Sequence, residues 1–320
     1  MNVISMSHQN TLDRASTGPD MPGRLTIESA RMSISASSIR RSISVLLGRD
    51  QTPSPLPVTG NKVTLVSRPV RLVEWDVSDE DMSRLWGHVR RSWEQLGRAS
   101  PHHSVLTSED FLPDNFKQNE EAFWQTAQHG TRKLGTWCRS AGIDLGQYKS
   151  CLDYGAGVGR MAMKFAETFE TVHAVDISQP HLDIAAERAA TLKLDNVECH
   201  RVDGDFFARM PAYDFFHSRL VLQHSPPPII RSVLRSLVGN LAPGGAGVFQ
   251  VPVYMNDYAF KVEDYLKAAE EGMEMHFLPQ AEVFNVIREG GARIRMVYED
   301  SDIGRPGEWV SNTIMISKDA

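Results

Sequence analysis

The chain has few cysteines, no long apolar run and no excess of basic residues. Its three cysteines, Cys138, Cys151 and Cys199, lie far apart and form no Cys-x-x-Cys pair. This argues against a disulfide framework or a cysteine zinc site and favours a reducing compartment. No apolar stretch approaches the ~18–20 residues of a membrane-spanning helix, and the N-terminus lacks a secretory pattern. We therefore expect a cytoplasmic protein without stable membrane insertion, and we identify no metal site.

The charge balance and the first part of the chain limit the partners further. The formal net charge is −6 over 320 residues, so the protein has no global basic footprint and we expect no nucleic-acid partner. Residues 1–62 are rich in Ser, Pro and Arg without sustained apolar periodicity, which predicts a disordered tail and linker. Within it, residues 30–49 carry four arginines and no acid. A helix that binds a surface is the alternative there to a solvated tail.

Residues 63–148 predict a helical N-terminal extension. Ser78 with Asp81 forms a capping signature, and apolar residues recur at helical spacing behind it. A second helix is predicted over 116–137, although its two glycines argue against an unbroken helix. The loop between the helices carries His102 and His103. These form either a solvent-exposed pair or part of a loop that folds over an active site.

A strand–loop–helix–strand unit organises the rest of the chain. A short apolar strand over 151–153 leads into a loop with glycines at alternate positions, namely Gly155, Gly157 and Gly159. A helix over 160–169 follows, and then a strand over 172–175 that ends in Asp176. In a parallel sheet both strand ends lie on the same edge, where ligands bind.

This unit predicts a site for a ligand that contains adenosine. Glycines let the backbone turn sharply and let a ligand approach the amides, and the following helix begins with free N–H groups. The carboxylate of Asp176 can accept hydrogen bonds from both ribose hydroxyls. The dinucleotide fingerprint G-x-G-x-x-G is not met, because Arg160 stands at the third glycine position. An NAD-type oxidoreductase is therefore disfavoured.

The pattern D-x-G-x-G-x-G that begins at Asp153 resembles motif I of class I S-adenosylmethionine-dependent methyltransferases. The resemblance implies S-adenosylmethionine as cofactor and Asp176, followed by Ile177, as the ribose-binding position. From residue 149 onward strands and helices alternate, and two antiparallel-capable strands are predicted at 293–298 and 309–317. We therefore expect an α/β, Rossmann-like seven-stranded methyltransferase sheet over 149–320.

Three further segments strengthen the resemblance. Asp203 and Gly204 follow the third predicted strand, where the family places contacts to adenine. Ser218, Gln223 and His224 lie at or after the fourth strand in a segment that resembles motif IV, with Gln223 beside the methionine moiety. A Pro-Gly-Gly turn at 242–245 precedes the fifth predicted strand. The expected cofactor-binding residues are Asp153, Gly155, Gly157, Gly159, Asp176, Ile177, Asp203, Gly204, Ser218 and Gln223.

His224 is the first candidate for a catalytic group. Methyl transfer needs a base only when the acceptor is a hydroxyl or a protonated amine, and an imidazole titrates near neutrality. The alternative is a histidine that only shapes the cofactor pocket. Glu274 and His276 form a second candidate pair, a base and the residue that orients it, unless both lie at the surface of a helix end.

Several short sequence segments indicate the class of methyl acceptor. LQHSPPPII (222–230) and FQVPVY (249–254) resemble bacterial methyltransferases associated with polysaccharide biosynthesis. This implies O-methylation of a saccharide or another small molecule. Ser225 and the three prolines after it lack the polar residue and the aromatic typical of base methylation. An inactive S-adenosylmethionine-binding module that acts through protein partners is the alternative, and the acceptor atom and oligomeric state stay open.

Overall fold

The computed structural model describes residues 72–267, 273–300, 302–303 and 308–320. The predicted tail and linker over 1–62 lie outside the described residues. Among the described residues, no helix combines the length and the apolar character needed to cross a membrane.

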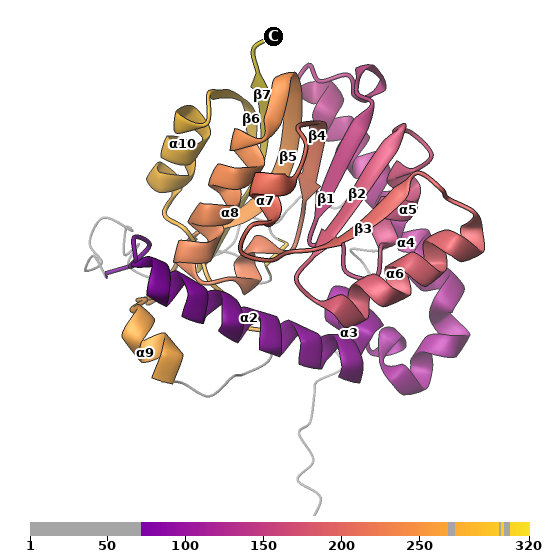
Figure 1. The fold of residues 1–320 in the computed structure, drawn as a ribbon, viewed down its shortest axis with the longest axis horizontal. Helices are drawn as coiled ribbons and strands as arrows, with labels where there is room; N and C mark the ends of the chain where they lie inside the picture. Colours follow the sequence, from indigo (N-terminus) through magenta and orange to yellow (C-terminus); the bar gives the residue numbers. More distant parts are fainter. Residues whose placement is uncertain (1–71, 268–272, 301, 304–307) are drawn as a thin grey trace, which may run out of the picture. The chain divides into compact units, whose positions relative to one another are not determined.

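A seven-stranded mixed sheet forms the centre of the fold, in the order β3-β2-β1-β4-β5-β7-β6 (Figure 1). Strand β7 runs antiparallel to β5 and β6, and the strands from β3 to β5 are parallel. This confirms the predicted fold class. The strands are β1 Ser150–Tyr154, β2 Thr171–Asp176, β3 Val197–Arg201, β4 Tyr213–Ser218, β5 Leu241–Met255, β6 Ala292–Asp300 and β7 Trp309–Lys318.

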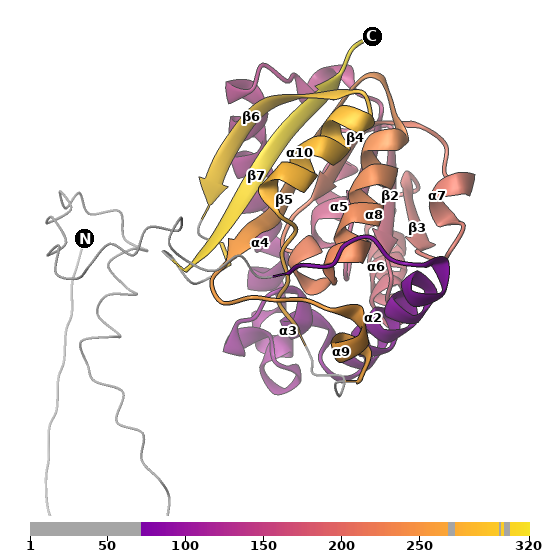
Figure 2. The same ribbon diagram turned by 90° about the vertical axis from the view of Figure 1, so that its left-hand side faces the viewer.

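Helices cover both faces of the sheet, as the buried apolar runs of the central strands require. One face carries α4 (Pro113–Ser140), α5 (Arg160–Phe165) and α6 (Gln179–Leu192). The other carries α7 (Phe206–Arg209), α8 (Pro227–Gly239) and α10 (Gln280–Glu289) (Figures 1 and 2). The short segments are α3 Pro101–Val105, α9 Val262–Lys267, η2 Glu109–Phe111, η3 Leu145–Gln147 and η4 Leu222–His224.

Helix α2 (Asp79–Ala99) lies across the edge of the sheet where the parallel strands end (Figure 1). Its N-terminus is the predicted one, since the Ser78 side chain accepts a hydrogen bond from the Asp81 amide. Near its other end, a Cβ on Gly97 would lie only 2.7 Å from Ser178 Oγ. Ser178 Oγ in turn donates to the Trp93 carbonyl. The absence of a side chain at Gly97 thus lets α2 pack directly on the start of α6.

Three details differ from the sequence-based expectations. Helix α4 is longer than predicted and is unbroken. Gly130 lies within it at the point where α4 meets α5, and a Cβ there would lie 2.7 Å from Met161 Sδ. Helix α5 ends at Phe165 rather than near 169. Strand β5 begins at Leu241, before the expected turn at 242–245, and that turn is an irregularity within the strand: pairing with β4 resumes at Ala246, and Gly244 between them has a φ of 77°.

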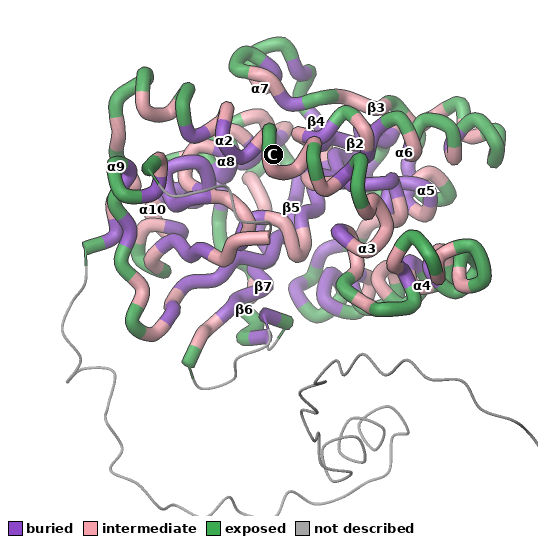
Figure 3. The backbone as a smooth tube through the Cα atoms, turned by 90° about the horizontal axis from the view of Figure 1, so that it is seen from below, coloured by how far each residue is buried: buried purple, intermediate pink, exposed green. Residues whose placement is uncertain are grey.

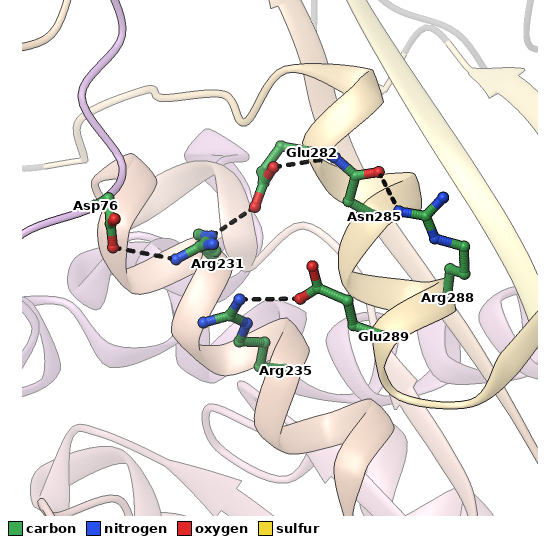
Figure 4. A network of polar contacts seen from close by, with 7 residues as sticks. All are labelled: Asp76, Arg231, Arg235, Glu282, Asn285, Arg288 and Glu289. Carbon is green, nitrogen blue, oxygen red and sulfur yellow. Dashed lines mark hydrogen bonds and ion pairs between the residues drawn. The ribbon is translucent and has the colours of Figure 1, made fainter.

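Ion pairs join α8 to α10 on the outer part of one face (Figure 4). Arg231 Nε bonds Glu282 Oε1, and Arg231 also reaches Asp76 at 3.4 Å. One turn further, Arg235 lies 2.9 Å from Glu289. The Arg231–Glu282 pair is mostly shielded from solvent, so this side of the fold is fixed by charge as well as by apolar packing. Figure 3, seen from the edge near α2 and α3, shows buried residues in the central strands, whereas the edge strands β3 and β6 are mostly intermediate or exposed.

Candidate active site

A cavity of about 300 Å³ opens where the chain reverses its direction of progress across the sheet. Strands β1, β2 and β3 are added outward, and β4 then returns to the other side of β1. At such a switch point the loops after β1 and β4 diverge and leave room for a ligand. The cavity is lined by the segments after β1, β2 and β4 and by α2, α3 and α4.

The glycine loop forms one wall of the cavity. Gly155, Gly157 and Gly159 all have positive φ, at 76°, 55° and 80°, which a side chain would strain. The Gly157 amide donates to Asp176 Oδ2 at 2.8 Å, and the Ser178 amide donates to Oδ1 at 2.9 Å. These bonds fix the Asp176 carboxylate at the end of β2. Gly155, Gly157, Asp176 and Ile177 line the cavity, whereas Gly159 caps α5 behind it.

Asp153 also lines the cavity, at the end of β1. Its Oδ1 lies 2.8 Å from Nδ1 of His217 on β4, and both side chains are buried. Since a carboxylate only accepts hydrogen bonds when ionised, Nδ1 of His217 is the donor. The sequence reasoning missed His217, although its place in β4 beside β1 follows from the parallel register of Asp153 and His217.

Five of the predicted cofactor-binding residues do not line the cavity: Gly159, described above, and Asp203, Gly204, Ser218 and Gln223. Asp203 forms an ion pair of 2.8 Å with Arg209, and this hydrogen bond lowers the pKa of the Asp203 carboxyl. Gly204 beside it is exposed. Ser218 and Gln223 are buried behind the cavity wall, and among the described residues neither Ser218 Oγ nor Gln223 Oε1 has a hydrogen-bond partner.

His224 lines the cavity from η4. Its Nδ1 lies 2.8 Å from the Glu274 carbonyl oxygen, which only accepts, so Nδ1 carries the proton and Nε2 keeps its lone pair in the neutral ring. Burial lowers the pKa of His224 to about 4, despite the opposing effect of that hydrogen bond. The edge of the ring meets Trp93 at a centroid distance of 5.4 Å. His224 is thus a neutral, oriented imidazole at pH 7.

Glu274 and His276, the second candidate pair, lie next to each other, but behind His224 rather than in the cavity. Glu274 Oε2 accepts from Tyr265 at 2.6 Å and lies 3.4 Å from His276 Nε2. Burial would raise the pKa of Glu274, but the hydrogen bonds from His276 and Tyr265 outweigh it and lower the pKa. Tyr258 closes the network with a contact of 2.7 Å to His276 Nδ1. The cluster therefore supports His224 through the Glu274 carbonyl.

Three cationic side chains also line the cavity, a feature that the sequence reasoning did not identify. They are Lys133, Arg160 and Arg219. Burial lowers the pKa of Arg160 to about 10, with Asp153 opposing and Arg219 adding to the shift. Arg219 pairs with Asp302, and Lys133 lies 3.5 Å from the same carboxylate. One acid thus faces two cations, and the Nε atoms of Arg160 and Arg219 have no hydrogen-bond partner among the described residues.

The N-terminal helices complete the cavity. Trp86 and Trp93 from α2 and Ser104 and Val105 from α3 form part of its lining. The predicted alternative of a loop over the site therefore fits Ser104 and Val105 better than the two histidines, which do not line the cavity. His102 is not fully exposed: it stacks on Phe116 with ring centroids 3.4 Å apart, and burial lowers its pKa to about 4.

Comparisons with known proteins match the part of the chain that contains the glycine loop. Residues 151–245 match the family model described as a methyltransferase domain. A curated relative, protein-L-isoaspartate O-methyltransferase 1 of Nitrosospira multiformis, is 30% identical over 114 residues, which cover 35% of this chain and 45% of the relative. The chain thus spans less than half of the length of that relative. The residues that match the family model run from β1 to the beginning of β5, so they include the glycine loop, Asp176 and His224.

Two solved structures of low sequence identity align with this chain. Magnesium protoporphyrin IX methyltransferase from Synechocystis PCC 6803, solved with bound S-adenosylhomocysteine, aligns with a TM-score of 0.49 and 15% identity, over 72% of this chain and 98% of that chain. A putative sarcosine dimethylglycine methyltransferase from Galdieria sulphuraria aligns with a TM-score of 0.45 and 18% identity, over 62% and 88%.

Proposed function

We propose that this protein is an S-adenosylmethionine-dependent methyltransferase that methylates an oxygen atom of a saccharide or another small molecule. The observation that carries the proposal is the glycine loop bonded to the Asp176 carboxylate at the rim of a cavity at the switch point of the sheet. The match of residues 151–245 to a methyltransferase domain supports it.

The residues at the cavity fit the cofactor. Asp176 would accept hydrogen bonds from the ribose hydroxyls, and the amides of the glycine loop would lie along the ligand. A side chain at Gly157 would enter this space, since its Cβ would come within 2.6 Å of Val105. The methionine part carries one carboxylate, for which Arg160, which follows the glycine loop and lines the cavity, would supply the counter-charge. When bound, the cofactor supplies an electrophilic methyl group on a sulfonium.

His224 is the group we assign to the acceptor proton. Its Nδ1 is held by the Glu274 carbonyl, so Nε2 is the atom that takes a proton from an acceptor hydroxyl. The depressed pKa keeps Nε2 unprotonated at neutral pH. Glu274 and His276 position this ring and do not touch the acceptor. Because the methyl donor is already activated, the remaining catalysis comes from holding the two reactants in line.

The basic part of the cavity favours an acceptor with a negatively charged group. Lys133 and Arg219 share one carboxylate, Asp302, so this pair retains a net positive charge. Both cations also lie against the Trp137 ring, at 4.8 and 5.8 Å from its centroid. A flat hydrophobic surface beside an unbalanced cation suits an acidic saccharide or another acidic small molecule.

The proposal is tested by methyl transfer from radiolabelled S-adenosylmethionine to neutral and acidic acceptors of matched size, beginning with sugars and uronic acids. We expect labelled product and S-adenosylhomocysteine in equal amounts, with acidic acceptors preferred. In Lys133→Met and Arg219→Met we expect the KM of acidic acceptors to rise about tenfold, with the KM of neutral acceptors unchanged; Lys117→Met, outside the cavity, is the control. Cofactor binding without any turnover across the panel would favour the inactive binding module instead.

A further inference from the structure

A cluster of two histidines and one glutamate lies on strands β2 and β3, outside the cavity. It consists of His173, Glu198 and His200. His173 faces Glu198 across the parallel pair, and His200 lies two residues further along β3 on the same face of the sheet. Cys199 between them points to the opposite face, where it packs with α6. None of the three lines the cavity.

One ligand atom from each of these three side chains lies close to the other two. His173 Nδ1 lies 3.2 Å from His200 Nε2 and 3.2 Å from Glu198 Oε2, and His200 Nε2 lies 3.3 Å from Glu198 Oε2. Ligand bonds to zinc are about 2.0–2.1 Å long in tetrahedral sites, which places neighbouring ligand atoms roughly 3.3–3.4 Å apart. The triangle therefore has the size of one face of a zinc coordination tetrahedron.

Hydrogen bonds alone do not explain this triangle. If both imidazole nitrogens carry protons and donate to Glu198, two N–H groups face each other at 3.2 Å. If only one nitrogen carries a proton, the other lies 3.2 or 3.3 Å from the carboxylate oxygen with no proton between the two atoms. One of the three contacts is unfavourable in either case. A cation between the three lone pairs makes all of them favourable, and the single negative charge of the set suits a divalent ion.

We propose that His173, Glu198 and His200 bind a zinc ion or a similar divalent transition metal, with water as a fourth ligand. Two imidazoles and a carboxylate are typical zinc ligands. The His173 side chain is buried, while those of His200 and Glu198 are 32% and 53% exposed, so solvent reaches the open position. The ion would tie the edge strand β3 to β2 and would act on stability rather than on methyl transfer.

Metal titration of the full-length, untagged protein tests this proposal. The protein is stripped with a chelator, dialysed and titrated with zinc chloride by calorimetry, and in parallel with cobalt chloride, whose visible spectrum reports coordination. We expect one ion per chain with micromolar or tighter affinity, a four-coordinate cobalt spectrum and a higher Tm with zinc. Absence of binding by the wild-type protein, or a six-coordinate spectrum typical of the ion in water, would overturn the proposal.

Matched variants separate this site from other histidines. Glu198→Gln and His200→Ala remove ligands that are partly exposed, so both variants should fold, which circular dichroism checks. Each should weaken zinc binding at least tenfold and abolish the zinc-dependent gain in Tm. The controls are Glu187→Gln and His103→Ala, which lie outside the cluster and should bind zinc as the wild type does. Equal zinc affinity in all four variants would assign the binding to other surface groups and refute the site.

Discussion

Two clusters of histidine and glutamate lie on the sheet and its loops, and they differ in how their atoms are paired. Beside the cavity, His224 and His276 each face groups of defined role: a carbonyl for the first, and Tyr258 and Glu274 for the second. On β2 and β3, His173 and His200 face each other and share one carboxylate oxygen.

This difference shows that composition alone does not assign a cluster. In the cavity cluster each short contact joins a donor to an acceptor, so protons and lone pairs can be assigned without conflict. In the strand cluster no assignment of protons satisfies all three contacts. We infer that the first cluster orients a base and that the second binds a cation. The following predictions test that contrast, beginning with the largest effect.

His224→Gln should lower kcat by roughly 100-fold or more, because a positioned general base contributes about 10²–10⁴. The Kd for S-adenosylhomocysteine should change less than about threefold, since the glycine loop and Asp176 are intact. Steady-state kinetics and calorimetry on the same preparation measure both. His129→Gln, another histidine of the cavity lining, is the control and should keep most of the activity. An unchanged kcat in His224→Gln would reduce His224 to a residue that shapes the pocket.

Acid should destabilise the fold through His224 and His102, whose pKa values burial lowers to about 4. The unfolded rings take up protons below a pKa of about 6.5, whereas the folded rings stay neutral until about pH 4. The contribution to stability is therefore present above pH 6.5 and falls as the pH drops, by about 2 kcal/mol for His224 between pH 7 and pH 5. The loss through His102 should be smaller, because its half-buried ring is partly screened by solvent.

Urea unfolding at pH 7 and pH 5 measures this loss. His102→Gln and His224→Gln cannot take up the proton, so each should make the free energy of unfolding less dependent on pH than in the wild type. A pH dependence that is the same in both variants and in the wild type would contradict the assignment of buried neutral rings.

Tyr265→Phe should lower kcat by about threefold, which is a smaller effect. It removes one hydrogen bond of about 1 kcal/mol to the side chain of Glu274, the residue whose carbonyl holds His224. Without this bond the pKa of Glu274 should rise, and the acid limb of the pH–rate profile should shift. Tyr148→Phe, which lies just before β1 and outside the cavity, is the matched control. If the profile of Tyr265→Phe coincided with that of Tyr148→Phe, the network would have no positioning role.

Removal of metal should leave the methyl-transfer rate within about twofold at 25 °C, because the strand cluster lies outside the cavity. The same treatment should lower the Tm of the wild type and not that of Glu198→Gln. Activity and thermal unfolding before and after chelation measure both quantities. A loss of activity that zinc restores would connect the two clusters and contradict the contrast between them.

Much of the fold, and the place of five of the ten predicted cofactor-binding residues at the cavity, are predictable from the sequence, because they depend on local patterns. The alternating glycines, Asp153 and Asp176 lie within one βαβ unit, and the parallel sheet brings its strand ends together. The remaining strands are predictable as alternating apolar segments, whereas their order in the sheet comes from the structure. The helix boundaries are less predictable: Gly130 interrupts the pattern of α4, yet its role is to let Met161 approach.

The remaining site residues escape sequence reasoning because they come from distant segments. Lys133 on α4 meets Arg219 and Asp302 only through the packing of α4 against the sheet. His173 and His200 belong to two strands, so no spacing in one segment reveals them as a pair. Asp203 was predicted from its place after β3, but whether it faces a ligand or Arg209 depends on the conformation of that loop.

The central claim is that the glycine loop and Asp176 bind S-adenosylmethionine. Calorimetric titration of the intact protein with S-adenosylhomocysteine tests it most directly, alongside Asp176→Ala and the exposed control Asp195→Ala. We predict micromolar binding by the wild type and by Asp195→Ala, and a loss of at least tenfold in Asp176→Ala. Absence of binding by the wild type, or equal affinity in Asp176→Ala, would contradict the account.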